Sequence, residues 1–238
     1  MDALILVGGK GTRLKEIFSD LPKPMVPVSG KPFLEWLLIS LKSKGILNVV
    51  LATSYLSHVI EGYFKDGAPW GMKIAYSHET SPLGTGGAVR LALNKMNTNN
   101  FLVLNGDSFC PWDFHLMKNF HAEKKASATL WLSQVGDGSR FGQVNLEKNG
   151  EITGFQEKNH KKASSLISAG IYIIQRKAIE AFPPQKEFSI EKDFFTHLIG
   201  KKLYGIVGPG PFLDIGTPES YALASQYLQN EFNKLTVP

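Results

Sequence analysis

The 238-residue chain has almost no cysteine, since Cys110 is its single one. One cysteine excludes an intramolecular disulfide, and such a chain suits a reducing cytosol. No activating side chain stands beside Cys110 in the sequence. We therefore interpret it as a small, partly buried apolar residue and not as a nucleophile.

Long apolar runs are also missing. The opening run, MDALILVGG, is far too short for a signal peptide or a membrane span, and no other stretch approaches about twenty apolar residues. No repeat or low-complexity tract divides the chain, and its 43% hydrophobic and 20% charged residues are typical of globular proteins. We predict one cytoplasmic domain over residues 1–238, with no membrane partner.

Several familiar chemical signatures are absent. A P-loop needs four residues between its glycines and a Gly-Lys-Ser/Thr ending. The dinucleotide fingerprint needs a third glycine near Leu14 and an acidic residue where Ala52 and Thr53 stand. The six histidines have no His-x-x-x-His spacing, and His115 and His121 fit a helix face better than a metal site.

The chain is basic, but its lysines are not concentrated in one segment. Its net charge of +5 and pI near 9.1 fit an anionic ligand such as a phosphate ester, and they also fit nucleic acid. A nucleic-acid-binding module should gather its lysines and exposed aromatic residues on one face. The lysines here are spread along the chain, so we predict no nucleic-acid partner.

The first half alternates short apolar runs with amphipathic ones. This pattern predicts strands at 3–7, 49–52, 72–76 and 101–104, and helices that start at Phe33, cover 59–64 and run over about 85–94. Such alternation predicts a mostly parallel sheet with helices on both faces. Ligands of these sheets bind beyond the carboxyl ends of the strands.

The second half is richer in strands. It predicts strands at 128–133, 142–146, 152–156 and 169–174, with a hairpin turn at Asn149-Gly150, as an antiparallel extension of the same sheet. A helix over about 218–228 follows residues 212–214, with Thr217 as its cap. The predicted fold class is α/β, a Rossmann-like three-layer sandwich with a mainly parallel, mixed central sheet.

Two segments near the N-terminus suit phosphate chemistry, although a plain strand-to-helix turn is the alternative for the first and a solvated lysine in a proline turn for the second. Gly8-Gly9-Lys10-Gly11-Thr12-Arg13 follows the first strand, where glycines let backbone N–H groups approach phosphate oxygens and Arg13 adds a planar cation. Lys23 stands between Pro22 and Pro24, so a stiff segment presents an ammonium group that we predict to be exposed.

These motifs resemble the sugar-1-phosphate nucleotidylyltransferase family over nearly the whole chain. A Gly-Gly-x-Gly-Thr-Arg loop followed by Pro-Lys-Pro is typical of that family. Five further segments are similar to family motifs in the expected order: Leu83–Ala88, Asn105–Asp107, Phe155–Lys158, Ser168–Tyr172 and Asp214–Pro218. The chain departs from the pattern at Ser168, where the family often has Asn.

The resemblance implies the nucleotide-diphospho-sugar transferase fold and the transfer of a nucleoside monophosphate from a triphosphate to a sugar 1-phosphate. Residues 1–110 would form a nucleotide-binding half and residues 111–238 a sugar-phosphate-binding half. The implied nucleotide contacts are Leu6, Gly8, Gly9, Gly11, Thr12, Arg13, Glu79, Gly84, Thr85 and Asn105. The implied sugar-phosphate contacts are Gly142, Glu157, Lys158 and Gly170.

The implied mechanism agrees with phosphate chemistry. A sugar 1-phosphate is already ionised near neutral pH, because its second pKa is about 6, so it needs no general base. The site must instead bring two anions together and stabilise charge at the α-phosphorus. Arg13, Lys23 and Asp107 are the implied catalytic residues, and Asp107 and Asp214 would hold Mg²⁺.

The sequence indicates the identity of the nucleobase and of the sugar less directly than it indicates the type of reaction. Glu79 can accept from guanine N1–H and N2–H₂ together, which favours GTP, although a uracil N3–H also fits. The chain is most similar to guanylyltransferases acting on D-glycero-D-manno-heptose 1-phosphate, an activity of lipopolysaccharide or capsule biosynthesis. Guanylyl transfer to mannose 1-phosphate, and uridylyl or thymidylyl transfer to glucose or N-acetylmuramate 1-phosphate, remain alternatives.

Other classes of protein fit less well. A glycosyltransferase is expected to carry Asp-x-Asp, but Ser108 and Phe109 follow Asp107. A protein that binds a nucleotide sugar without catalysis is the remaining alternative. A homodimer is a hypothesis that no feature of the sequence specifies.

Overall fold

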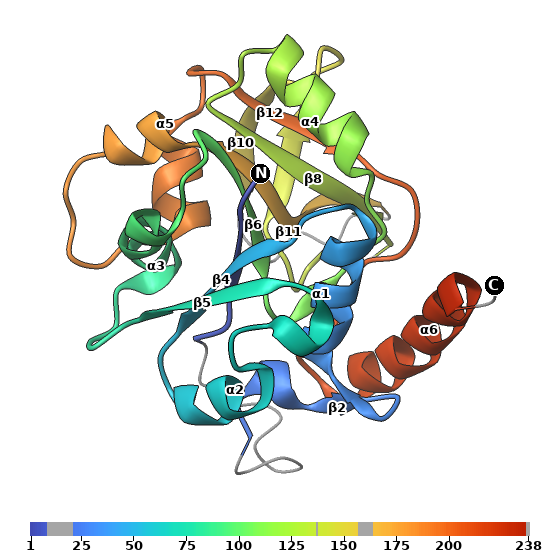
Figure 1. The fold of residues 1–238 in the computed structure, drawn as a ribbon. Helices are drawn as coiled ribbons and strands as arrows, with labels where there is room; N and C mark the ends of the chain where they lie inside the picture. The colour runs from blue at the N-terminus through green and yellow to red at the C-terminus, as the bar shows by residue number, and fades with distance from the viewer. Residues whose placement is uncertain (9–20, 137, 157–163, 237–238) are drawn as a thin grey trace.

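The centre of the molecule is a twisted sheet that begins with parallel strands (Figure 1). The computed structural model describes residues 1–8, 21–136, 138–156 and 164–236. The parallel strands pair in the spatial order β6-β1-β4-β5, and they are β1 (Ala3–Leu6), β4 (Asn48–Thr53), β5 (Lys73–His78) and β6 (Asn100–Asn105). The helical segments that connect them are α1 (Phe33–Ser43), α2 (Ser57–Phe64) with η2 (Ala68–Trp70), and α3 (Gly84–Ala92) with η3 (Leu93–Lys95).

Side chains of β1 alternate between two hydrophobic clusters, one on each face of the sheet. Ala3 and Ile5 pack with α1 and α2, whereas Leu4 packs with α3 on the other face. Period-two alternation places successive side chains on opposite faces of a strand, so helices must cover both. Burying each large apolar side chain stabilises such layers by roughly 1.5–3 kcal/mol. The predicted three-layer α/β fold is confirmed.

The second half extends the same sheet with antiparallel strands, as predicted. The long strand β11 (Ser165–Gln175) pairs antiparallel with β6. The further strands are β8 (Ala128–Val135), β9 (Gln143–Leu146), β10 (Ile152–Gln156) and β12 (Leu203–Val207), of which β12 is parallel to β8. Gly150 has a φ of +85° in the β9–β10 connection, so the predicted hairpin turn is confirmed.

A β-bulge interrupts β11 where it passes the end of β6. The pairing of β11 with β8 shifts register between Ser168 and Ile171, and Gly170 has a φ of +73°. A Cβ on Gly170 would lie 2.8 Å from Asn105 Nδ2. Glycine is therefore required here, because it permits both the left-handed backbone and the close approach of the two strands.

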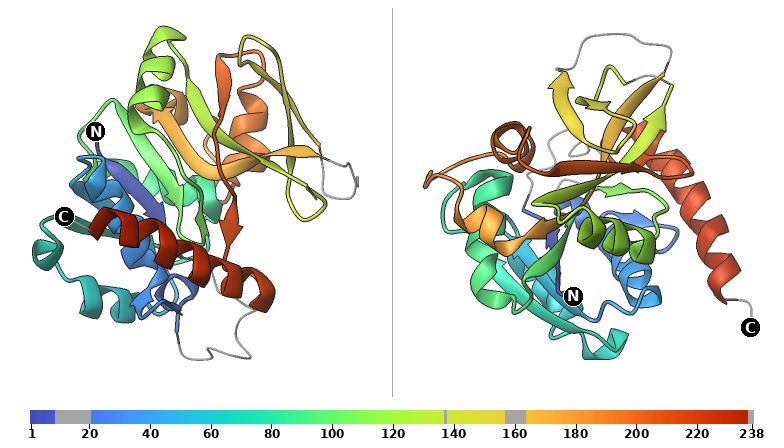
Figure 2. Two further views of the ribbon diagram at one scale, coloured as in Figure 1. Left: turned by 90° about the vertical axis from the view of Figure 1, so that its right-hand side faces the viewer. Right: turned by 90° about the horizontal axis from the view of Figure 1, so that it is seen from above.

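Short elements connect the sheet to the C-terminal helix. The pair β7 (Ser108–Phe109) and β13 (Leu213–Asp214) is antiparallel, and α6 (Pro218–Thr236) begins shortly after β13. Figure 2 shows α6 extending outward from the body of the molecule. Its first turns contact the ribbon of β2 (Pro27–Val28) and β3 (Lys31–Pro32), where Ser29 Oγ donates to the Ser225 carbonyl at 2.9 Å.

Some elements were not predicted from the sequence. They include the strand β12, the two-residue strands β2, β3 and β7, the short helix α5 (Arg176–Glu180) and the π-helical turn η4 (Ile190–Phe195). The helix α4 (Phe114–Glu123) carries His121, which is buried as Cys110 also is. No helix within the described residues has both the length and the apolar character needed to cross a membrane.

Candidate active site

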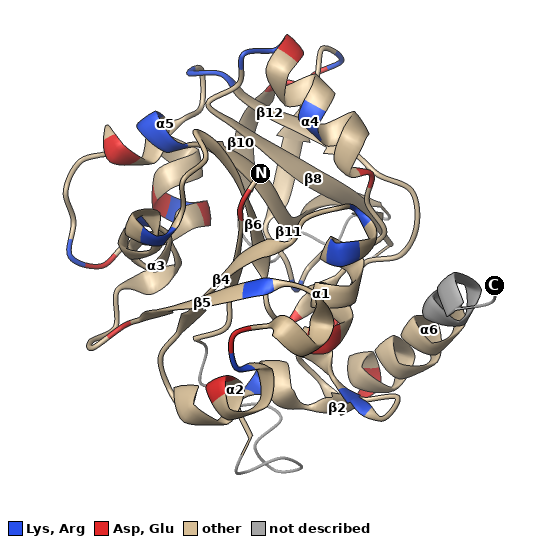
Figure 3. Ribbon diagram, in the orientation of Figure 1, with Lys and Arg blue, Asp and Glu red and all other residues tan. Residues whose placement is uncertain are grey.

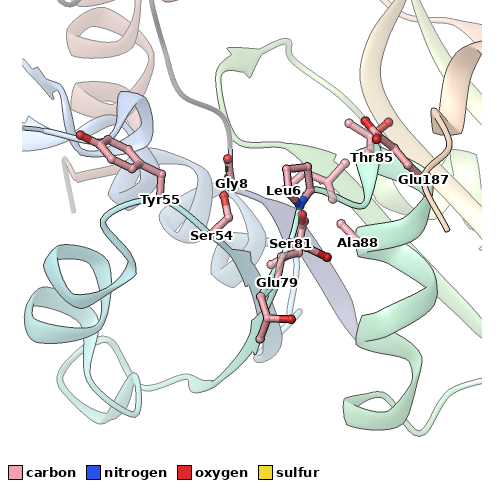
Figure 4. A pocket seen from close by; sticks show the side chains of 13 residues that line it. Leu6, Gly8, Ser54, Tyr55, Glu79, Ser81, Thr85, Ala88 and Glu187 are labelled. Carbon is pink, nitrogen blue, oxygen red and sulfur yellow. Dashed lines mark hydrogen bonds between the residues drawn. The ribbon is translucent and has the colours of Figure 1, made fainter.

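A first pocket of about 430 Å³ lies at the carboxyl ends of β1, β4 and β5, where ligands of parallel sheets are expected. It brings together five residues that the sequence assigned to the nucleotide: Leu6, Gly8, Glu79, Gly84 and Thr85. Figure 4 shows Glu79 and Ser81 between Tyr55 on one side and Thr85 with Glu187 on the other.

The carboxylate of Glu79 is held at the wall of this first pocket. Its Oε2 accepts a hydrogen bond from the Leu83 N–H at 3.3 Å, and its own N–H donates to the Thr53 carbonyl at 3.0 Å. Burial raises the pKa of Glu79, an effect that the hydrogen bond from Leu83 opposes. The side chain thus stays directed toward a ligand-sized space.

The start of α3 forms another wall of the first pocket. Gly84 has a φ of +69°, and a Cβ there would lie 2.5 Å from the Phe188 carbonyl oxygen. The Gly86 N–H donates to that carbonyl at 2.9 Å, and Thr85 Oγ1 accepts from the Ile190 N–H at 2.9 Å. The glycines therefore let α3 contact the segment before η4 closely.

A second pocket, of about 290 Å³, adjoins the first at the end of β6. Leu6 lines the first pocket, Asn105 lines the second, and the two residues are register partners in neighbouring strands. The second pocket contains five residues that the sequence assigned to the site: Lys23, Asn105, Asp107, Gly142 and Asp214. Candidate nucleotide and phosphate contacts thus share one edge of the sheet.

Lys23 enters the second pocket from a rigid turn. It begins the 3₁₀ turn η1 (Lys23–Met25) between Pro22 and Pro24, both buried. Its Nζ lies 2.7 Å from Asp107 Oδ2. Its side chain is only 17% exposed, which corrects the prediction that this lysine is exposed. The ion pair with Asp107 and the buried prolines account for the difference.

The pairing of β7 with β13 brings Asp214 beside Asp107. Asp214 pairs with Ser108, and the Ile215 N–H donates to the Asp107 carbonyl at 3.1 Å. Asp214 Oδ1 accepts from the Gly216 N–H at 2.7 Å and from Ser220 Oγ at 3.1 Å. The backbone of the loop that leads into α6 therefore fixes this carboxylate.

The predicted cap of α6 is present. Thr217 Oγ1 accepts from the Ser220 N–H at 3.2 Å, so it satisfies a backbone donor in the first turn of α6. Ser220 Oγ in turn contacts Asp214. The helix start and the carboxylate thus belong to one hydrogen-bond network.

Charges of both signs line the second pocket. Arg140 Nη2 lies 3.2 Å from both carboxylate oxygens of Asp214, in addition to the pair between Lys23 and Asp107. Within the described ranges no group of three or more His, Cys, Asp or Glu side chains could hold a metal alone. Asp107 and Asp214 nevertheless suit Mg²⁺, which typically takes one or two carboxylates and completes its coordination with phosphate oxygens and water.

Sequence reasoning missed two charged residues of the second pocket, Arg140 and Glu191. Arg140 precedes the assigned Gly142 by two positions, and this proximity was a signal that could have found it. Glu191 belongs to η4, which no pattern predicted, so no sequence signal pointed to it. In the first pocket, Ser54, Tyr55 and Glu187 were also missed.

The remaining assigned residues fall in two groups. Gly170 lies at the β11 bulge, where a Cβ would lie 2.8 Å from Ser108 Oγ, itself at the second pocket. The others lie outside the residues that the structure describes, and they are Gly9, Gly11, Thr12, Arg13, Glu157 and Lys158.

Comparison with known proteins identifies close sequence relatives. The chain is 42% identical over 221 residues to the D-glycero-alpha-D-manno-heptose 1-phosphate guanylyltransferase of Campylobacter jejuni, covering 93% of this chain and 97% of the relative. It is 38% identical over 231 residues to the enzyme of the same name from Aneurinibacillus thermoaerophilus, covering 97% and 99%.

A longer relative is also similar. The mannose-1-phosphate guanylyltransferase of Mycobacterium tuberculosis is 38% identical over 228 residues, and the match covers 94% of this chain but only 64% of that protein.

Solved structures show the same fold. HddC from Yersinia pseudotuberculosis complexed with GMP-PN matches with a TM-score of 0.81 and 34% identity, covering 95% of this chain and 98% of that one. A putative glucose-1-phosphate thymidylyltransferase from Bacillus anthracis matches with a TM-score of 0.85 at 24% identity, covering 97% and 96%. The family model described as nucleotidyl transferase matches residues 2–231. The chain belongs to the nucleotidyl transferase family.

Proposed function

We propose that this enzyme transfers a guanylyl group from GTP to a sugar 1-phosphate and releases pyrophosphate. The observation that carries the proposal is the juxtaposition of two pockets at one sheet edge. One pocket presents Glu79, an acceptor for a base, and the other presents Lys23, Arg140, Asp107 and Asp214. Such an arrangement can bind a nucleotide and bring a second phosphate to its α-phosphorus.

Glu79 supports GTP as the donor. A carboxylate accepts from guanine N1–H and N2–H₂ together, whereas adenine lacks both of these donors. The names of the relatives from Campylobacter jejuni and Aneurinibacillus thermoaerophilus, both guanylyltransferases, also support this base. A uracil N3–H could be accepted as well, so uridylyl transfer is the alternative that the experiment must separate.

The second pocket supports transfer without a general base. An oxygen of the ionised sugar phosphate attacks the α-phosphorus of GTP while the bond to the β-phosphate breaks. We assign Lys23 to the α-phosphate, Arg13 to the departing phosphates and Lys158 to the sugar phosphate. Arg140 is added to these cations because it lies in the same pocket. Mg²⁺ held by Asp107 and Asp214 would supply further positive charge there.

The sugar is proposed to be D-glycero-D-manno-heptose 1-phosphate. The near-complete coverage of both heptose relatives favours it, because the mannose relative is matched over only part of its length. Gly142, Glu157 and Gly170 are the assigned contacts of the sugar moiety. We further propose a single catalytic domain over 1–238 that acts in the cytoplasm, in lipopolysaccharide or capsule biosynthesis, and that assembles as a homodimer.

A substrate panel tests the proposal. The protein is incubated with Mg²⁺, one nucleoside triphosphate and one sugar 1-phosphate at a time, and pyrophosphate release is measured. We expect release only when both substrates are present, with GTP and with a manno-configured heptose 1-phosphate preferred over mannose 1-phosphate. Release with UTP but not GTP would overturn the base assignment.

The panel also separates the alternative classes. A protein that binds a nucleotide sugar without catalysis would release no pyrophosphate from any pair. Basic and acidic residues are interspersed along the ribbon in Figure 3, which supports a small phosphate ligand over nucleic acid.

A further inference from the structure

Glu191 differs from the other carboxylates of the second pocket in its ion pairing. Asp107 is paired with Lys23 and Asp214 with Arg140, both at 3.2 Å or less. Glu191 lines the same pocket, is exposed there, and forms no ion pair with any residue in the described ranges. Its charge is therefore not committed to a neighbouring cation.

A chain of hydroxyl groups, centred on the buried Tyr172, orients the Glu191 carboxylate. The Tyr172 hydroxyl donates to Glu191 Oε1 at 2.6 Å, and Ser168 Oγ donates to the Tyr172 oxygen at 3.2 Å. Burial and the nearby Glu191 charge raise the pKa of Tyr172 well above its ordinary value, so the phenol stays protonated. Its single proton points to Glu191, which keeps its other lone pairs for a ligand.

Glu191 enters the pocket from a different layer than the other charges. The η4 residues Ile190 and Phe194 pack in the hydrophobic cluster that contains α3, whereas Phe109 and Ile215, beside the two aspartates, pack in the cluster with α1. A phosphate placed among Lys23, Arg140 and the aspartates would thus leave the rest of its ester to face Glu191.

A hydrogen bond to Thr85, which lines the first pocket, holds the segment that carries Glu191. The Ile190 N–H donates to Thr85 Oγ1 at 2.9 Å, and Thr85 lines the first pocket together with Glu187. Residues 187–191 therefore contribute a carboxylate to each pocket and form part of the wall between them. A carboxylate that is already held in place before the substrate arrives loses less conformational entropy on binding.

We propose that Glu191 binds ring or side-chain hydroxyls of the sugar 1-phosphate and helps to select the sugar, with Tyr172 as its positioning residue. A carboxylate accepts from two neighbouring hydroxyls, and such charged hydrogen bonds discriminate strongly against a substrate that lacks one of them. This inference rests on the proposed function, since it names a residue that recognises the sugar 1-phosphate, the acceptor substrate.

The test combines Glu191→Gln with monodeoxy analogues of the preferred sugar 1-phosphate. In the wild type, removing the bound hydroxyl should lower kcat/KM by about 10–100-fold. In Glu191→Gln the parent substrate should lose a similar factor, while that analogue should lose little more. The KM for GTP should stay within about twofold of the wild-type value.

Two further variants control for structural effects. Glu123→Gln makes the same change on the exposed side of α4, where the side chain is 73% exposed, and it should behave as wild type. Tyr172→Phe should also reduce the discrimination against the deoxy analogue, because Glu191 loses its orienting donor. A merely structural role of Tyr172 would lower activity with both substrates equally.

The outcomes separate this inference from the proposed function. An active wild type, together with a Glu191→Gln variant that keeps full kcat/KM for the parent sugar, would overturn the role of Glu191 alone. So would a variant that discriminates against every deoxy analogue as strongly as the wild type does. A wild type that transfers to no sugar 1-phosphate would overturn both proposals together.

Discussion

Lys23 is held in place by two buried prolines and by the Asp107 carboxylate, 2.7 Å from its ammonium group. We predict that Lys23→Ala lowers kcat by about 10²–10³, because one preorganised charge at the reacting phosphate is lost. The fold should survive, since Asp107 is 45% exposed and an ion pair near solvent contributes only about 0–1 kcal/mol. Pyrophosphate release and urea unfolding measure the two effects. Wild-type turnover in this variant would remove Lys23 from the site.

The protonation of Glu79 should make the enzyme's preference for guanine depend on pH. Burial raises the pKa of its carboxyl group, so on acidification it takes up a proton at a higher pH than an ordinary glutamate does. The protonated form accepts guanine donors poorly. We expect wild-type kcat/KM for GTP to exceed that of Glu79→Gln by about 10–100-fold at pH about 8, and the ratio to fall on acidification. Because substrate phosphates titrate equally in both proteins, a ratio independent of pH would contradict this role.

Residues with a local signature were predictable, and residues placed by long-range contacts were not. The prolines beside Lys23 and the strand end before Asp107 can be recognised in the sequence, whereas Glu79 was assigned through the family resemblance; all three lie in the pockets. Arg140 and Glu191 enter the site through loop and π-helical geometry, which tertiary packing determines. No sequence neighbour of Glu191 indicates its role, and the one signal for Arg140 is the assigned Gly142 two positions later.

At the scale of elements, the start of α3 tolerates no side chain at Gly84. Gly84→Ala would combine an unfavourable left-handed backbone with a contact of 2.5 Å to the Phe188 carbonyl. We predict a loss of at least about 1–2 kcal/mol in unfolding free energy and a raised KM for GTP, because this turn lines the first pocket.

A second glycine provides the matched control. Gly62 lies within α2, and a Cβ there would meet no atom within 4 Å. Gly62→Ala should therefore stabilise the protein by roughly 0.5–1 kcal/mol without changing KM. Urea unfolding of both variants checks the pair, and equal effects would contradict the geometry at Gly84.

The elements themselves were predictable where the hydrophobic period was regular. The strands and helices of the first half follow this pattern, since their alternate residues fill two clusters. The pairing of β7 with β13 joins residues far apart in the chain, and a two-residue strand has no period to detect. η4 was missed because its π-helical turn does not repeat at 3.6 residues.

At the scale of the whole molecule, His121 links stability to pH. It is 3% exposed, its Nδ1 lies 2.9 Å from Thr129 Oγ1, and burial lowers its pKa from 6.5 to about 4. Between these values the unfolded chain binds a proton that the folded one does not, so stability is full above pH 6.5 and falls on acidification.

The expected size of this effect is measurable. Wild-type unfolding free energy should fall by about 2 kcal/mol between pH about 7.5 and about 5 on account of this residue. His121→Gln, which cannot titrate there, should lack that part of the loss. Urea unfolding at both pH values decides the matter, and an identical pH dependence in the two proteins would contradict a neutral buried His121.

The proposed guanylyl transfer depends on the direct attack of the sugar phosphate on GTP, and an isotope experiment tests this step. A sugar 1-phosphate labelled with ¹⁸O in its non-bridging phosphate oxygens is incubated with GTP and Mg²⁺, and the products are analysed by mass spectrometry. We predict that the whole label appears in the nucleotide sugar and none in pyrophosphate, because a phosphate oxygen of the sugar forms the new bond. Label in pyrophosphate, or in free phosphate formed without a nucleotide sugar, would contradict the account.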